Sequence, residues 1–145
     1  MDWYMAVMRK YADFNGRARR QEYWMFQLIN MLIGFAFAIV IIAAAVLFQH
    51  SQSQGFVVLF MIPLWLYCLA IFIPSLAVTV RRLHDIGKSG FWYFIAFVPF
   101  IGGIILLVFT CMDSEPGPNL YGPSPKYSGS YGYAPPVPPP LPPAY

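Results

Sequence analysis

The longest uninterrupted pattern in this sequence is apolar. Between Glu22 and Arg81 there is no Asp, Glu, Lys or Arg, and almost every residue is hydrophobic. One helical crossing of a bilayer core takes about 20 apolar residues. The segment is therefore long enough for two crossings, over residues 24–48 and 56–79, with a polar turn at 49–55. A third apolar stretch covers 91–111, so the pattern predicts an all-α integral membrane protein with three transmembrane helices.

The first 22 residues have a different periodicity. Trp3, Val7, Tyr11 and Phe14 recur at helical spacing and fall on one face. We expect residues 1–22 to form a cytoplasmic, amphipathic segment whose helix lies on the membrane surface. A helix packed against the membrane domain (23–112) explains the same pattern equally well, and the two arrangements are compatible.

Composition and charge agree with a membrane location and suggest an orientation. Hydrophobic residues make up 59% of the chain and charged residues 10%, against roughly 25% charged in soluble domains. Lysine and arginine concentrate before the first apolar stretch and in the loop 80–90, and such residues favour the cytoplasmic side. The N-terminus is therefore predicted to be cytoplasmic. Three crossings then put the tail (113–145) in the periplasm, whereas a re-entrant 91–111 segment, kinked at Pro99 and Gly102, would leave it in the cytoplasm.

The tail changes composition at about residue 123, from where proline, tyrosine and glycine dominate. Such a segment has too little apolar surface to fold, so we predict disorder with extended polyproline conformations. Proline-rich stretches can dock on aromatic grooves of partner proteins. A solvated tether without a dedicated partner is the simpler interpretation.

The polar residues that flank the apolar stretches form one candidate cluster on the predicted cytoplasmic face. We expect Glu22 to pair with Arg81 or Arg82, and Asp85 to pair with Arg17 or Arg20. The same basic pocket suits an anionic lipid headgroup. Gly87 and Gly90 favour a tight turn, and Ser89 is placed to cap the next helix. The full cluster is Gly16, Arg17, Arg20, Glu22, Arg81, Arg82, His84, Asp85, Gly87, Ser89 and Gly90.

The sequence offers no recognisable catalytic, cofactor or metal site. His50 and His84 are predicted on opposite sides of the membrane, and Cys68 and Cys111 at different depths. His84 and Asp85 are adjacent, so on a helix they point about 100° apart and do not form a ready-made dyad. The apolar stretches carry no charge, which argues against an ion-coupled transporter working alone. No nucleic-acid partner is expected.

Several blocks of residues occur together in a distinctive order. They are Phe14, Gly16, Arg17, Ala18, Arg20, Glu22, Tyr23 and Trp24, then Pro74 to Gly90, Pro99 with Gly102, and a signature from Asp113 to Gly122. These blocks resemble a known bacterial family, the domain of unknown function 805, which comprises small inner-membrane proteins of the YhaH type. The resemblance covers residues 4–125 and implies a location in the bacterial cytoplasmic membrane, but no activity. Ile86 and Phe91 stand where the family usually has threonine and tryptophan.

The leading functional hypothesis is a non-enzymatic accessory or scaffold protein of the inner membrane. Its Arg/Asp/Glu cluster would tie helices together and contact anionic lipid or a partner, which includes a second copy of the chain or another membrane protein. The alternative is a subunit of an oligomeric channel or transporter, because three helices are few for a lone pore. A lipid-modifying enzyme that uses His84 and Asp85 is a third hypothesis.

Overall fold

A computed structural model describes residues 2–47 and 55–127 of this chain. The described part is all-helical apart from turns and one isolated bridge between Asn119 and Gly122. Its elements are α1 (Asp2–Arg9), α2 (Arg20–Leu47), α3 (Gly55–Asp85), the 3-10 helix η1 (Gly90–Phe97) and α4 (Gly102–Cys111).

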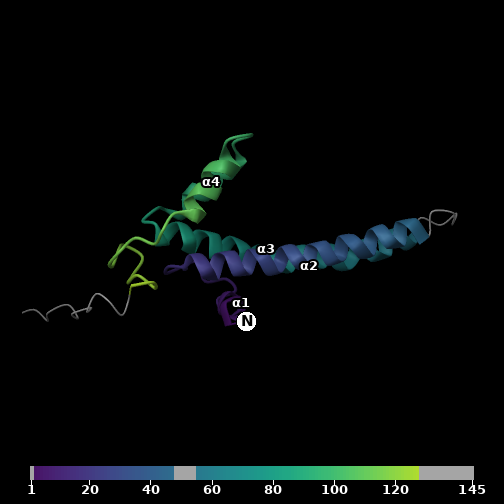
Figure 1. Ribbon diagram of the computed structural model, residues 1–145, viewed down its shortest axis with the longest axis horizontal. Coiled ribbons are helices and arrows are strands. Elements are labelled where there is room, and N and C mark those ends of the chain that lie inside the picture. Colours follow the sequence, from purple (N-terminus) through teal and green to yellow (C-terminus); the bar gives the residue numbers. More distant parts are fainter. Residues whose placement is uncertain (1, 48–54, 128–145) are drawn as a thin grey trace, which may run out of the picture.

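The long helices α2 and α3 lie side by side and form the axis of the molecule (Figure 1). The 28 residues of α2 span about 42 Å at 1.5 Å per residue, more than the hydrocarbon core of roughly 30 Å. Arg20–Leu47 and Met61–Asp85 are both long and apolar enough to cross a membrane. Their outer surface is apolar and exposed, for example at Leu47 and Leu69. Such a surface suits hydrocarbon as the solvent.

Polar groups inside the α2–α3 pair are satisfied by neighbouring helices. The hydroxyl of Tyr67 donates to the amide oxygen of Asn30 across the pair. Pro74 lies inside α3 and has no N–H, so the carbonyl of Ala70, one turn earlier, loses its helical donor. The hydroxyl of Tyr11 donates to that carbonyl instead. This contact explains how α3 continues through the proline.

The short helix α1 packs against the start of α2 and the end of α3. Val7 is fully buried and lies in one core cluster with Phe26 and Val78, and the ring of Tyr4 stacks on Phe26 at 5.4 Å. The helix ends at Arg9, so Tyr11 and Phe14 lie in the following turn and not on the predicted helical face. The packed arrangement expected from the sequence is present; whether α1 also lies on a lipid surface stays a prediction.

The third apolar segment does not form the single membrane-crossing helix that its composition predicted. The 3-10 helix η1 runs outward, the chain turns at Phe100 (φ 67°), and α4 returns against η1 (Figure 1). Both ends of this η1–α4 hairpin lie beside the C-terminal end of α3. Pro99 removes a helical donor at the turn. A Cβ on Gly102 would lie 1.8 Å from the carbonyl oxygen of Ile95, so this close return needs glycine.

The hairpin also changes where the tail begins. Residues 113–127 lie at the same end of the α2–α3 pair as Arg17, so they do not leave on the opposite side as three crossings would require. The structure also describes residues 124–127, in which Ser124 is buried and Lys126 contacts Asp113. The rest of the predicted disordered tail, 128–145, lies outside the described residues, as does the turn at 48–54.

Candidate functional site

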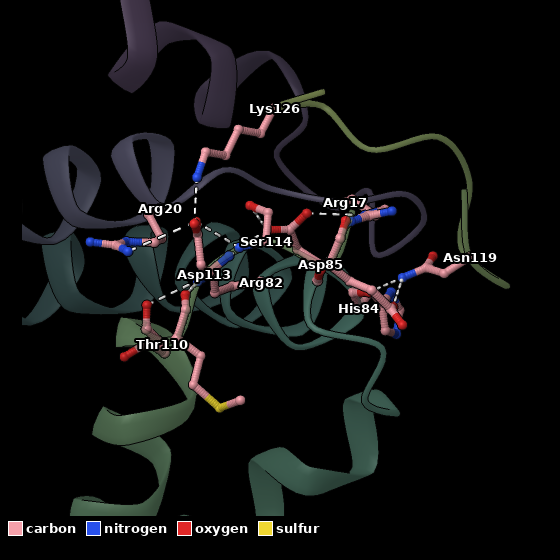
Figure 2. Close-up of polar contacts among 12 residues, drawn as sticks. Arg17, Arg20, Arg82, His84, Asp85, Thr110, Asp113, Ser114, Asn119 and Lys126 are labelled. Carbon is pink, nitrogen blue, oxygen red and sulfur yellow. Dashed lines mark hydrogen bonds and ion pairs between the residues drawn. The ribbon is translucent and has the colours of Figure 1, made fainter. Parts of the chain in front are cut away.

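Arg17 is the centre of a buried polar network at the end of the α2–α3 pair (Figure 2). It lies in the turn before α2, and 1% of its side chain is exposed. Its Nε donates to Asp85 Oδ1 at 3.0 Å, and its Nη2 donates to the carbonyls of Asp85 at 3.1 Å and Glu115 at 2.6 Å. Its Nη1 donates to the carbonyl of Gly117 at 2.8 Å. One guanidinium thus joins the N-terminal turn, the end of α3 and the segment after α4.

Asp85 is the anion of this network and is fully buried. Its Oδ2 accepts from Arg82, one turn earlier on α3, and from the hydroxyl of Ser114 at 2.5 Å. Arg82 also donates through Nε to the carbonyl of Thr110 at 3.1 Å and through Nη2 to the carbonyl of Met112. The last turn of α4 leaves carbonyls without helical donors. Arg82 satisfies one of them, that of Thr110, together with the carbonyl of the C-cap residue Met112, and thereby fixes the end of the hairpin to α3.

A second buried ion pair joins α2 to α3. Arg81 Nη1 lies 3.0 Å from Glu22 Oε1, and the side chain of Arg81 is fully buried. The carbonyl of Arg81 accepts from the backbone N–H of Ala18 at 3.0 Å. Within the described residues, Nε and Nη2 of Arg81 have no hydrogen-bond partner. Of the alternative partners expected from the sequence, Glu22 pairs with Arg81 and Asp85 pairs with Arg17, and Asp85 also pairs with Arg82.

His84 points away from Asp85 and has different neighbours. Its ring stacks on Tyr121 with centroids 3.7 Å apart and planes 2° from parallel. Its Nδ1 lies 3.3 Å from the carbonyl oxygen of Gly16, and its own carbonyl accepts from the side-chain amide of Asn119 at 2.9 Å. No contact joins the His84 and Asp85 side chains, so the geometry gives this pair no acid–base relay.

The glycines and Ser89 shape the loop that follows α3. Gly87 has φ +70°, and a Cβ there would lie 2.7 Å from Glu115 Oε2. Ser89 precedes η1, and its hydroxyl accepts from the N–H of Phe91 at 3.4 Å. A Cβ on Gly90 would lie 2.8 Å from Val80. These residues let the chain leave α3 in a tight turn and bring η1 close against it.

Arg20 is the one arginine of the predicted cluster that stays at the surface. It lies 3.9 Å from Asp113, and half of each side chain is exposed. Asp113 also binds Lys126 at 2.5 Å. The hydrogen bond from Lys126 holds the pKa of Asp113 below its ordinary value of 3.8. Arg20, Asp113 and Lys126 line a polar pocket of about 360 Å³ together with Arg19 and Ser114.

The segment 113–122 supplies partners that side-chain reasoning missed. Ser114 and Asn119 use side chains, whereas Glu115 and Gly117 accept through backbone carbonyls. The signal available was the family signature over these residues, which gave no role. Among residues 2–47 and 55–127, no group of three or more His, Cys, Asp or Glu is arranged to hold a metal ion, and Cys68 and Cys111 are unpaired.

Comparison with known proteins places these residues in a family. Residues 11–123 match the family described as "Protein of unknown function (DUF805)". The chain is 44% identical to the inner membrane protein YhaI of Escherichia coli K12 over 130 residues, which are 90% of this chain and 100% of YhaI. It is 40% identical to the inner membrane protein YhaH of the same strain over 126 residues, 87% of this chain and 98% of YhaH. No solved structure matches. The network of Arg17, Arg82 and Asp85 falls within the matched residues, and the chain belongs to the DUF805 family of inner membrane proteins.

Proposed function

We propose that this protein is a non-enzymatic accessory or scaffold protein of the bacterial inner membrane. The observation that carries the proposal is that Arg17 and Arg82 are buried and form their hydrogen bonds inside the fold. Their guanidinium groups donate to Asp85 and to carbonyls of three chain segments, so each of their nitrogens has a partner inside the fold. Buried and fully paired groups of this kind hold elements in place. Contact with anionic lipid is then left to the exposed cations, among them Arg9, Arg20 and Lys126.

The distribution of charge supports a cytoplasmic location for the network. All nine lysines and arginines lie in segments at one end of the α2–α3 pair. An excess of these residues marks the cytoplasmic side of a membrane protein. With two crossings, the N-terminal segment and residues 113–127 would both be cytoplasmic. A reporter that is active only in the cytoplasm, fused after Tyr127, should therefore give a signal; a signal from a periplasm-specific reporter at that site would contradict this orientation.

The η1–α4 hairpin is suited to the interface between headgroups and acyl chains. It exposes a row of aromatic side chains, and Phe100 at its turn is 96% exposed. Irregular backbone is not stable when it faces hydrocarbon directly, whereas aromatic side chains favour the interface. We therefore expect the hairpin to lie in the cytoplasmic leaflet and to enlarge the protein's lipid contact beyond two helices. The exposed aromatic residues are Phe91, Phe94, Phe97 and Phe100.

Lipid analysis of the purified protein tests whether the buried arginines stabilise the fold while the exposed cations bind anionic lipid. A variant with Arg9, Arg20 and Lys126 all changed to alanine should keep the wild-type melting temperature but co-purify with fewer anionic phospholipids. Arg17→Lys serves as the matched control, because it should lower the melting temperature and leave the exposed cations in place. The proposal fails if the triple variant retains as much anionic lipid as the wild type.

Two further measurements separate the competing functions. A channel subunit would form a ring-shaped oligomer, which native mass spectrometry in detergent detects. The Asn30–Tyr67 hydrogen bond uses polar groups within one α2–α3 pair and so does not favour a pore. An enzyme that depended on His84 would lose activity in His84→Ala without loss of abundance. The contacts of His84 with Gly16 and Tyr121 predict lower abundance instead.

A further inference from the structure

A mostly apolar pocket of about 330 Å³ lies between α3, η1 and the segment after α4. Leu76 and Val80 of α3 contribute aliphatic side chains, and His84 contributes a ring. Among the described residues, no Lys, Arg, Asp or Glu lines the pocket, so it does not resemble a site for a charged headgroup. An engineered cavity of roughly 150 Å³ is enough for benzene; this pocket has room for a larger, substituted ring. Its aromatic lining consists of Phe91, Tyr93, Phe94 and Tyr121.

The pocket faces the apolar surroundings of the protein. Phe91 is 80% exposed and Phe94 is 60% exposed, and both belong to η1. Leu76 and Val80 lie within α3, inside the stretch that is long and apolar enough to cross a membrane. A molecule dissolved in the bilayer can therefore reach the pocket without passing through water. This access favours a lipid-soluble ligand.

His84 places in this lining a nitrogen that can act only as a hydrogen-bond acceptor. The carbonyl of Gly16 can only accept, so the 3.3 Å contact puts the ring proton on Nδ1 and leaves a lone pair on Nε2. His84 is 9% exposed, and Nε2 has no partner among residues 2–47 and 55–127. A Cβ built on Gly90, another lining residue, would lie 3.5 Å from Nε2. Because position 90 is glycine, no side chain from that position covers Nε2, and both residues line the pocket.

We propose that this pocket binds the aromatic headgroup of a membrane-dissolved quinol, with one quinol O–H donating to Nε2 of His84. A planar ring matches the aromatic walls, since stacked and edge-on aromatic contacts add to the hydrophobic contribution. The quinol hydroxyl supplies the donor that Nε2 lacks. The inference concerns binding alone and goes beyond the scaffold function, but it rests on the membrane placement of the η1–α4 hairpin proposed above.

The direction of this hydrogen bond predicts selectivity for the oxidation state. An oxidised quinone has carbonyl oxygens, which only accept, and it cannot donate to Nε2. The hydroxyls of Ser89, Tyr93 and Tyr121 can donate or accept and so do not discriminate between the two forms. Loss of one hydrogen bond in an apolar site corresponds to roughly tenfold in affinity. The quinol should therefore bind roughly tenfold more tightly than the quinone.

Native mass spectrometry of the full-length protein in detergent tests the proposal. The probes are decylubiquinol under anaerobic, reducing conditions, decylubiquinone, and dioleoylglycerol as a lipid alcohol without a ring. We expect one decylubiquinol per chain, weaker binding of decylubiquinone, and little competition from dioleoylglycerol. Equal affinity for decylubiquinone would contradict the hydrogen bond from the quinol O–H to Nε2. Effective competition by dioleoylglycerol would contradict the preference of the pocket for an aromatic ring.

Two matched variants on η1 locate the site. Phe94→Ala removes a lining residue and should weaken decylubiquinol binding by roughly fivefold, the contribution of one aromatic contact. Phe97→Ala removes another exposed phenylalanine of the same helix, 75% exposed against 60% for Phe94, that is not among the pocket's lining residues, so its affinity should stay at the wild-type value. His84→Phe keeps an aromatic ring beside Tyr121 but lacks Nε2, and should bind roughly tenfold less tightly. Equal affinities for Phe94→Ala and Phe97→Ala overturn the proposal even if His84→Phe does not fold.

Discussion

Replacement of Arg17 by lysine tests whether the buried network stabilises the fold through the shape of the guanidinium or only through its charge. Arg17 donates to the Asp85 carboxylate and to the carbonyls of Asp85, Glu115 and Gly117. A single lysine ammonium has no planar fork and reaches the carboxylate at best. Three carbonyl bonds are then lost at about 1 kcal/mol each. We expect Arg17→Lys to destabilise the protein by about 3 kcal/mol and to lower its melting temperature by about 10 °C.

Thermal unfolding of the purified protein in detergent, followed by circular dichroism, measures this loss. Arg20→Lys is the matched control, because Arg20 is half exposed and only 3.9 Å from its partner Asp113. Exposed pairs contribute about 0–1 kcal/mol, so this variant should melt close to the wild type. Equal melting temperatures for Arg17→Lys and the wild type would refute the reasoning, since the charge alone would then account for the network.

Three other changes have definite expected outcomes. Tyr11→Phe should cost about 1 kcal/mol in the wild type but much less on a Pro74→Ala background, where the α3 backbone can supply the missing donor; a double-mutant cycle in thermal unfolding measures the difference. Gly102→Ala forces a Cβ onto the carbonyl of the preceding 3-10 helix and should destabilise by about 1–3 kcal/mol, visible as faster proteolysis of the hairpin. The lowered pKa of Asp113 means that its contribution is complete above its ordinary value of 3.8 and is lost as the pH falls further; acid titration of Asp113→Asn should lack this step.

The long helices and the main ion pairs could be predicted from the sequence because both depend on local or strongly restricted patterns. An uncharged stretch between Glu22 and Arg81 leaves little choice but two membrane helices. Glu22 and Asp85 lie at the ends of the apolar segments, and their positions left each acid with two candidate arginine partners. The structure forms the pairs of Glu22 with Arg81 and Asp85 with Arg17, and it adds the buried pair of Asp85 with Arg82.

The path of residues 91–111 could not be predicted from their hydrophobicity. An apolar composition does not say whether the chain crosses the membrane or turns back. Pro99 and Gly102 were the available signals of a break, and they allowed a kinked crossing as well as a return. The decisive contacts are the bonds from Arg82 to the carbonyls of Thr110 and Met112. Backbone acceptors carry no residue-specific signal, so neither these bonds nor those from Arg17 to Glu115 and Gly117 are visible in the sequence.

The span of the network along the chain has a consequence for biosynthesis. Arg17 and Gly117 are separated by 100 residues, which a ribosome adds in about 5–20 s. During that interval the arginines that end up buried must remain hydrated or be held by the insertion machinery, because their final acceptors do not yet exist. A chain that terminates before residue 113 would keep both apolar hairpin helices but lack several of these acceptors. Proteolytic quality control in the membrane should therefore remove such truncated chains selectively.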